Sequence, residues 1–145
     1  MKFLQKFWQC LGSFFPNKRL TPSDSLTRFI FAANHFNFQK NKVLGAAFMP
    51  LSPPRNLETS IYKTKGLNEH KIWKQGEKVG KVSKRNLKAR ADFEVKSVNA
   101  ASLSVQPDKW PSRHANIIGW PSHEKKSEQM RLANILALAA RLKMP

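Results

Sequence analysis

Apolar and polar residues alternate most regularly between residues 85 and 95. The apolar positions are Leu87, Ala89, Ala91, Phe93 and Val95, and the charged positions are Lys88, Arg90, Asp92, Glu94 and Lys96. Successive side chains of a strand point to opposite faces of a sheet, so a period of two residues indicates a strand. We therefore predict a half-buried strand whose charged side faces solvent.

Four other segments are short, apolar and rich in β-branched or aromatic residues, which is typical of strands. These segments are residues 26–31, 43–49, 57–64 and 103–105. Among them, Asn68 is placed to cap a short helix, and Gly76 is expected to end it. The middle of the chain is therefore predicted to consist mainly of strands.

The C-terminal part of the chain has the pattern of a long helix over about residues 123–143, with Ser122 as its N-cap. Apolar residues occur on nearly all sides of its last turns, so we expect the helix to be buried against a sheet. Acidic residues such as Glu124 come first and basic residues such as Arg141 come last, which favours a helix through its dipole. The free amides of its first turn would suit a phosphate group.

Residues 1–15 have the spacing of an amphipathic helix, with apolar positions at Phe3, Leu4, Phe7, Trp8, Leu11, Phe14 and Phe15. Lys6 and Gln9 interrupt this apolar surface, so we do not expect a secretory signal. Three roles remain open for the helix: packing on the protein's own core, binding a partner protein, or lying on an anionic membrane surface. Residues 16–24, which contain Pro16 and Pro22, are expected to be a linker.

The order of these elements shows no regular alternation of strand and helix. It predicts an α+β fold, in which a small and mostly antiparallel sheet is covered on one face by the C-terminal helix. The predicted organisation is therefore an N-terminal amphipathic helix over residues 1–15, a linker over 16–24 and a basic α+β domain over 25–145.

The composition adds a constraint on the partner. The chain has 145 residues and a formal net charge of +17. Solubility of a small domain needs a net charge of only about 2 to 8, so the excess favours a polyanionic partner. We expect this partner to be DNA or RNA, with an anionic membrane or an acidic protein as alternatives. The single cysteine, Cys10, excludes an internal disulfide framework and suits a cytoplasmic protein.

The positive charge is concentrated between residues 63 and 90. The basic residues there are Lys63, Lys65, Lys71, Lys74, Lys78, Lys81, Lys84, Arg85, Lys88 and Arg90. Within this region, residues 76–85 are small, polar and basic, so we predict a mobile loop or an extended arm that an anionic partner orders. Lysine and arginine side chains neutralise backbone phosphates and release counterions, which makes this region the predicted nucleic-acid site.

Aromatic residues near basic ones add a weaker signal. Phe36 and Phe38 lie close to His35, Lys40 and Lys42, an arrangement that would allow bases to stack between phosphate contacts. The alternative is that both phenylalanines pack in the core. No recognised nucleic-acid-binding motif accompanies them, so base preference stays open.

The sequence contains none of the common catalytic motifs. An enzyme hypothesis is centred on His114, which lies in an unusual segment between two Trp-Pro pairs. His114 would act as general acid or base on a phosphate-containing or nucleotide substrate, with Glu58 as the second titrating group. Arg28, Arg90 and Arg113 are the candidate phosphate ligands. The alternative is that His114 only fastens a loop by hydrogen bonds.

The four histidines show no ligand spacing, so we expect no metal site, and no cofactor is indicated. The sequence therefore favours an accessory or adaptor protein that binds the nucleic-acid backbone, rather than an enzyme. Two alternatives remain: the phosphate- or nucleotide-handling enzyme centred on His114, and a peripheral membrane protein attached by residues 1–15.

Overall fold

The computed structural model describes residues 20–53, 56–109 and 111–145. The predicted N-terminal helix and residues 16–19 of the predicted linker lie outside these described residues. The elements are β1 Ser25–Ile30, η1 Ala33–His35, β2 Phe36–Asn37, β3 Lys42–Val43, η2 Gly45–Phe48, β4 Thr59–Lys63, α2 Glu69–Ser83, β5 Ala89–Glu94, α3 Val95–Ala100, β6 Ser104–Pro107, β7 His114–Ile118, α4 Lys126–Ala139 and β8 Arg141–Lys143. The predicted α+β class is confirmed.

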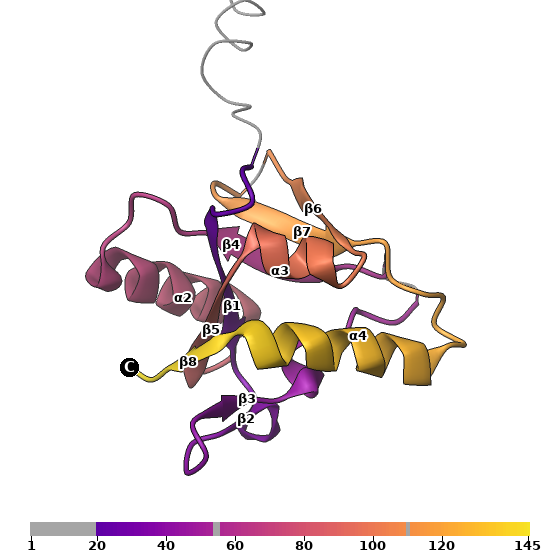
Figure 1. The fold of residues 1–145 in the computed structure, drawn as a ribbon. Coiled ribbons are helices and arrows are strands. Elements are labelled where there is room, and N and C mark those ends of the chain that lie inside the picture. Colours follow the sequence, from indigo (N-terminus) through magenta and orange to yellow (C-terminus); the bar gives the residue numbers. More distant parts are fainter. Residues whose placement is uncertain (1–19, 54–55, 110) are drawn as a thin grey trace, which may run out of the picture.

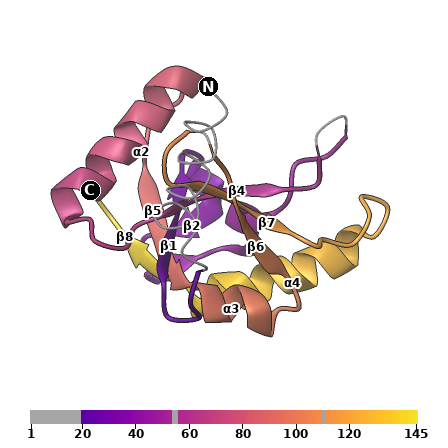
Figure 2. The ribbon, with the colours of Figure 1, turned by 90° about the horizontal axis from the view of Figure 1, so that it is seen from above.

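The main sheet has six strands in the order β6-β7-β4-β1-β5-β8, and every neighbouring pair is antiparallel. Figure 1 shows this sheet at the centre of the molecule, with the small β2-β3 hairpin below it. Helix α2 lies on one side of the sheet, and α3 and α4 lie on the other (Figure 2). The sheet therefore has two covered faces with different chemistry.

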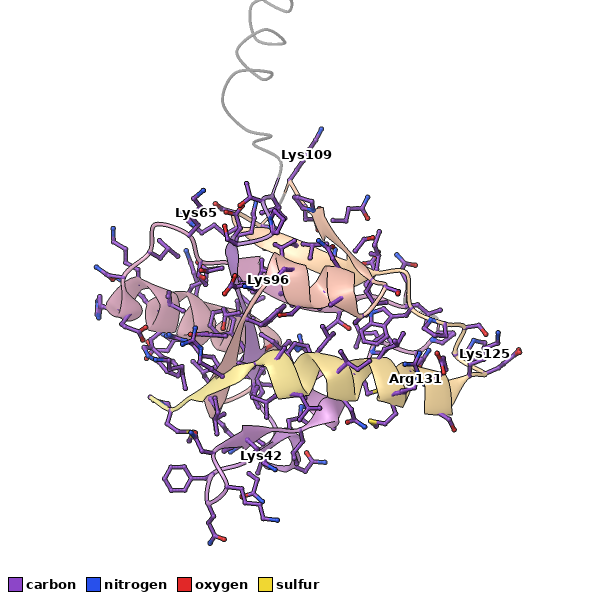
Figure 3. The ribbon with its side chains drawn as sticks, viewed as in Figure 1. Lys42, Lys65, Lys96, Lys109, Lys125 and Arg131 are labelled. Carbon is purple, nitrogen blue, oxygen red and sulfur yellow. The ribbon has the colours of Figure 1, made fainter. Side chains whose placement is uncertain are left out.

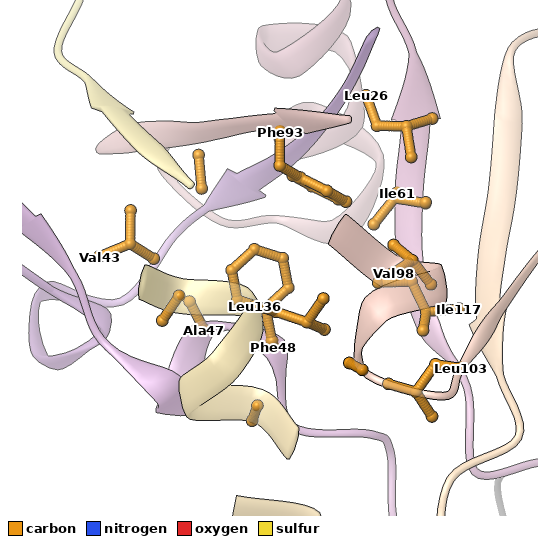
Figure 4. Close-up of a cluster of buried hydrophobic side chains, with 14 of the residues drawn as sticks. Leu26, Val43, Ala47, Phe48, Ile61, Phe93, Val98, Leu103, Ile117 and Leu136 are labelled. Carbon is orange, nitrogen blue, oxygen red and sulfur yellow. The ribbon is translucent and has the colours of Figure 1, made fainter. Parts of the chain in front are cut away.

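The larger core lies on the α3 and α4 side. Figure 4 shows apolar side chains of the sheet meeting those of α3, α4 and η2. Leu132 and Leu136 of α4 are buried there, and Phe48 of η2 meets Phe93 of β5 edge to face, with ring centroids 5.2 Å apart. Burying each such side chain contributes about 1.5–3 kcal/mol. The prediction that the C-terminal helix is buried against a sheet is confirmed.

The ends of this helix differ from the prediction. It begins at Lys126, and Ser122 does not cap it through its side chain but accepts a backbone hydrogen bond from Lys125. It ends at Ala139, and the next residues form β8, which pairs with the edge of β5. In this strand Leu142 packs on the core and the backbone groups of β5 gain partners. The predicted helix start and the predicted Ser122 cap are therefore wrong.

The segment 43–49, predicted as a strand, is mostly the 3₁₀ helix η2, so that prediction was wrong. The strand predicted over 85–95 is confirmed as β5, although it ends at Glu94, where α3 begins. His114 lies at the start of β7 and not in a loop, as the alternative role of His114 had assumed. Apolar side chains of all three segments, such as Phe48, Phe93 and Ile117, are buried in the core. Only their contacts with distant elements decide the backbone conformation.

Helix α2 covers the other face of the sheet. The Asn68 side chain caps it as predicted, accepting a hydrogen bond from the Lys71 amide at 2.9 Å. The helix then continues through Gly76 and Gly80 to Ser83, so the predicted helix end at Gly76 and the predicted mobile arm over 76–85 are wrong. A Cβ at Gly76 would lie 2.7 Å from the Phe29 ring. The glycines therefore allow the helix backbone to approach the sheet.

The side chain of Arg90, on β5, links the sheet to α2. Its side chain was predicted to face solvent, but it has 0% exposure. The guanidinium pairs with Asp92 at 3.0 Å and with Glu69 of α2 at 2.8 Å, and it lies 4.7 Å from the centroid of the Trp73 ring. The hydrogen bond from Arg90 lowers the pKa of Glu69. Helix α2 thus buries Arg90 on the charged side of β5, while Asp92 and Glu94 stay partly exposed.

Replacing Gly76 with alanine tests the contact between α2 and the sheet. Alanine is favoured over glycine within a helix by about 1 kcal/mol, but the new methyl group would collide with Phe29 and Leu87. We expect Gly76→Ala to lower the free energy of unfolding by about 1–3 kcal/mol, as overpacked cores do. Urea denaturation measures the change. Val82→Ala, at a position 84% exposed in the same helix, should change it by less than about 0.5 kcal/mol. A stabilised Gly76→Ala protein would contradict the contact.

Replacing Arg90 with methionine tests the buried ion pairs. Methionine keeps much of the side-chain volume but leaves the Asp92 and Glu69 carboxylates without their common partner. We expect a loss of about 3 kcal/mol in the free energy of unfolding, the lower end for a broken buried pair, because both carboxylates keep contact with water. Thermal or urea unfolding measures this loss. An unchanged stability would show that the Arg90 network contributes nothing.

Candidate nucleic-acid interface

Basic side chains occur on several elements of the domain, as Figure 3 shows for Lys42, Lys65, Lys96, Lys109, Lys125 and Arg131. Some of these are neutralised locally. Lys65 pairs with Asp24, Lys96 with Glu94, and Arg131 with Glu128. The position of the remaining cations relative to a concave surface is therefore more informative than their number.

Four of the predicted lysines form one stripe along α2. Lys71, Lys74, Lys78 and Lys81 are spaced by three, four and three residues, and all are exposed. At 100° per residue they occupy an arc of about 80° on the helix. Ile72, Gly76 and Gly80 occupy the opposite side, against the sheet. Packing of the glycine side therefore turns the lysine side outward.

The stripe borders a groove of about 510 Å³. Its lining residues are Leu67, Lys71, Lys74, Gln75, Glu77, Lys78, Lys81, Ser112 and Arg113. Five of these are cationic and one, Glu77, is anionic, so the groove carries a formal charge of 5 − 1 = +4. The turn before β7, which contains Ser112 and Arg113, thus completes a basic groove that begins on α2.

Arg113 is held in place by backbone carbonyl groups. Its Nη1 donates to the carbonyl oxygens of Lys65 at 2.9 Å and Lys63 at 3.3 Å. Its backbone has a φ of 68°, in the left-handed region that non-glycine residues rarely adopt. This turn geometry fixes Arg113 beside the groove before any ligand arrives.

A second hollow continues from the end of α2. It also measures about 510 Å³, and Lys81, Lys84 and Arg85 contribute its positive charge. Arg85 lies 4.3 Å from the centroid of the Phe31 ring, so its guanidinium is ordered against the sheet. Burial, together with Arg28 and Arg85, lowers the pKa of nearby His35. The basic surface thus extends from Arg113 along α2 toward η1.

The other predicted nucleic-acid residues are placed differently. Lys63 is half-buried on β4, Lys65 pairs with Asp24, and Lys88 is exposed just before β5. None of these three lines the groove beside the stripe. Arg90 is fully buried and has no surface to offer a phosphate, so its proposed role as a phosphate ligand is withdrawn.

Arg28 also has a structural position. Its Nε donates to the Ala47 carbonyl oxygen at 2.9 Å, and its Nη1 donates to the Ser60 carbonyl oxygen at 2.8 Å. Burial, with a smaller effect of Arg85, lowers the pKa of Arg28 to about 10. The guanidinium therefore connects η2 to β4, and two of its donors are already used within the fold.

His114 has partners that the sequence analysis did not identify. Its Nδ1 lies 3.0 Å from the Asp108 carboxylate, and its Nε2 lies 2.6 Å from Ser60 Oγ. The Tyr62 ring packs on the imidazole, with centroids 5.2 Å apart. Among the described residues, no hydrogen bond or ion pair joins the Glu58 carboxylate to His114. The structure therefore does not bring the predicted second titrating group to His114.

The two phenylalanines of the aromatic cluster have separate environments. Phe36 is half-buried and packs against the main core. Phe38 is 67% exposed in the turn of the β2-β3 hairpin, beside exposed Lys40 and Lys42. Core packing therefore accounts for Phe36, while Phe38 stays available for stacking.

A signal for the groove was present in the sequence. Lysines at a three-four-three spacing share one helix face, but the small, polar and basic composition of residues 76–85 predicted a mobile loop or an extended arm instead. The contribution of Ser112 had no local signal, since it depends on how the turn before β7 lies against α2.

In the part of the chain that the structure describes, no helix is long and apolar enough to cross a membrane. Within the same residues, no three His, Cys, Asp or Glu side chains are grouped as metal ligands. Comparison of the chain with protein-family models, with curated proteins and with solved structures finds no significant match. Any functional conclusion therefore depends on the geometry of the described residues.

Proposed function

We propose that this protein binds nucleic acid through the phosphate backbone, as an accessory or adaptor protein. The observation that carries the proposal is the stripe of four lysines on α2 that borders a groove with Arg113. A phosphodiester backbone is a linear array of negative charges, and a linear array of cations on a rigid element matches it.

The dimensions of the stripe support this proposal. Lys71 and Lys81 are ten residues apart, which corresponds to about 15 Å along a helix. Phosphates on one strand of a duplex are spaced by about 3.4 Å along the axis, so the stripe spans about four of them. A single phosphate-containing metabolite would occupy only a part of such a surface.

The proposed mechanism is electrostatic. Five cations of the groove, the four lysines and Arg113, replace counterions condensed on the phosphates, and the release of those counterions drives binding. The remaining predicted basic residues near it, Lys84 and Arg85, extend the contact toward η1. Backbone contacts of this kind position the protein on nucleic acid without reading its sequence.

The salt dependence of binding tests the stripe. If five phosphates are neutralised on a DNA duplex, affinity should fall about 500-fold between 50 and 200 mM salt, because the log-log slope is about −0.9 per contact. In a Lys74→Ala and Lys78→Ala double variant, three contacts remain and the same change in salt should cost about 40-fold. Fluorescence anisotropy with labelled duplex and single-stranded oligonucleotides measures both proteins.

The matched control is a Lys96→Ala and Lys125→Ala double variant, which removes the same charge from exposed positions at the start of α3 and before α4. It should keep most of the wild-type salt slope. The assignment to α2 is contradicted if both double variants lose affinity and salt slope equally. It is also contradicted if the Lys74→Ala and Lys78→Ala variant keeps the affinity and the salt slope of the wild type.

A further inference from the structure

A chain of hydrogen bonds links an aspartate, a histidine and a serine on the α2 side of the sheet. Asp108 Oδ2 lies 3.0 Å from His114 Nδ1, and His114 Nε2 lies 2.6 Å from Ser60 Oγ. A carboxylate can only accept a hydrogen bond, so Nδ1 of the neutral ring donates to it. Nε2 then carries the lone pair and accepts the hydrogen bond that the Ser60 hydroxyl donates.

The fold builds this chain from two antiparallel pairings. The link between β6 and β7 closes with a 2.9 Å hydrogen bond from the Asp108 amide to the His114 carbonyl oxygen, which brings the two side chains together. Pairing of β4 with β7 places Tyr62 opposite His114 and Ser60 opposite Asn116. The side chains of Ser60, Tyr62, His114 and Asn116 therefore share one face of the sheet.

The strands and Tyr62 hold the histidine rigidly. The Tyr62 ring packs edge-on against the imidazole, and the His114 side chain is only 14% exposed. Asp108, at the rim, keeps 45% exposure. A base whose orientation is fixed by a carboxylate and by packing is the requirement for activating a serine hydroxyl.

Asn116 adds a donor beside the serine. It is directly opposite Ser60 in the strand register, so their Cβ atoms are about 4.5–5.5 Å apart. Its side chain is half-exposed and makes no hydrogen bond to any other residue that the structure describes. Such an amide is placed to donate to an oxygen that becomes negatively charged next to Ser60 Oγ.

We propose that Ser60 is the nucleophile of an acyl-transfer site that hydrolyses carboxylic esters, with His114 as general base, Asp108 as the positioning residue and Asn116 as the oxyanion donor. This activity goes beyond nucleic-acid binding and uses none of the groove lysines. It also differs from the predicted use of His114, because neither a phosphate substrate nor Glu58 takes part.

The reaction balances with water as the second substrate. Ser60 Oγ forms a bond to the ester carbonyl carbon while its proton passes to His114 Nε2. The carbonyl oxygen becomes the oxyanion, which the Asn116 amide binds. The ester oxygen then leaves with its electron pair and takes the proton from His114. A water molecule next attacks the acyl-serine, with His114 accepting and returning the proton, and releases the carboxylic acid.

The charges around Ser60 favour acyl over phosphoryl transfer. A transferring phosphoryl group spreads negative charge over three oxygens and is usually held by several cationic groups. Near Ser60, the Arg28 guanidinium already donates to two backbone carbonyl oxygens, and Arg113 donates to two others. A neutral amide donor matches the single oxyanion of a tetrahedral acyl intermediate.

Labelling with diisopropyl fluorophosphate tests the nucleophile directly. The reagent transfers its phosphoryl group to an activated serine and releases fluoride, giving a stable mimic of the tetrahedral intermediate. We expect one label per chain by intact-mass spectrometry, mapped to Ser60 by peptide sequencing. Ser60→Ala should abolish the label, and Asn116→Ala should slow labelling about 100-fold. Ser104→Ala, on β6, which β7 separates from the strand of Ser60, should label like wild type.

His114→Gln should slow labelling of Ser60 by at least about 100-fold, because the general base is lost. If that variant does not fold, as judged by circular dichroism, Asp108→Asn at the exposed rim replaces it and should slow labelling at least about tenfold.

The proposal is overturned if Ser60 of the wild-type protein takes no label, or if Ser60 is labelled equally fast in the His114→Gln or Asp108→Asn variant. Binding to oligonucleotides should be unchanged in the Ser60→Ala protein, so failure here is distinguishable from failure of the groove.

Discussion

The packing of α2 on the sheet depends on backbone contact at Gly76 and Gly80. Neither position has room for a side chain, because a Cβ would meet the Phe29 ring at the first and the Arg85 carbonyl oxygen, at 2.7 Å, at the second. This contact fixes the rotation of the helix about its axis. The lysines, on the opposite side, are therefore directed outward, and Trp73 and Glu69 are directed to Arg90. One steric constraint thus determines both the exposed charge and the buried charge.

The two faces of the sheet have different physical roles. The α3 and α4 side is apolar and supplies most of the buried area. The α2 side has a small apolar cluster around Phe29, Tyr62 and Ile72, and it is otherwise polar, with Arg90 at one end and His114 toward the other. Buried polar groups are costly unless they are hydrogen-bonded. The hydrogen bonds and ion pairs of His114 and Arg90 therefore offset the cost of burying these side chains, and they also place chemistry on this face.

Features of the fold that depend on local sequence were predictable. The cap at Asn68 and the strand that contains Phe93 follow from short patterns of residue type. The extension of α2 through Gly76 was not, because a glycine in a helix is destabilising in isolation and its benefit comes from the sheet. The burial of Arg90 was not predictable for the same reason. The alternating pattern of β5 does not show that a helix from elsewhere in the chain covers Arg90.

The candidate sites show the same division. The lysines of α2 were found by composition, but the groove required the turn at Arg113, which lies far from them in the sequence. His114 was singled out by its unusual segment, but its partner Ser60 is separated from it by 54 positions and is brought near only by the pairing of β4 with β7. The sequence thus identified the lysines and His114. Their partners, Arg113 and Ser60, are brought near only by the tertiary fold.

The central claim is that nucleic acid lies along the lysine stripe of α2 and against Arg113. The most direct measurement is an NMR titration of the ¹⁵N-labelled protein with a short DNA duplex at low salt. The account predicts that the largest shift changes map to α2 between Lys71 and Lys81 and to Ser112 and Arg113. Shift changes centred on the β2-β3 hairpin or on α4, or an absence of changes on α2 at saturating duplex, would contradict it.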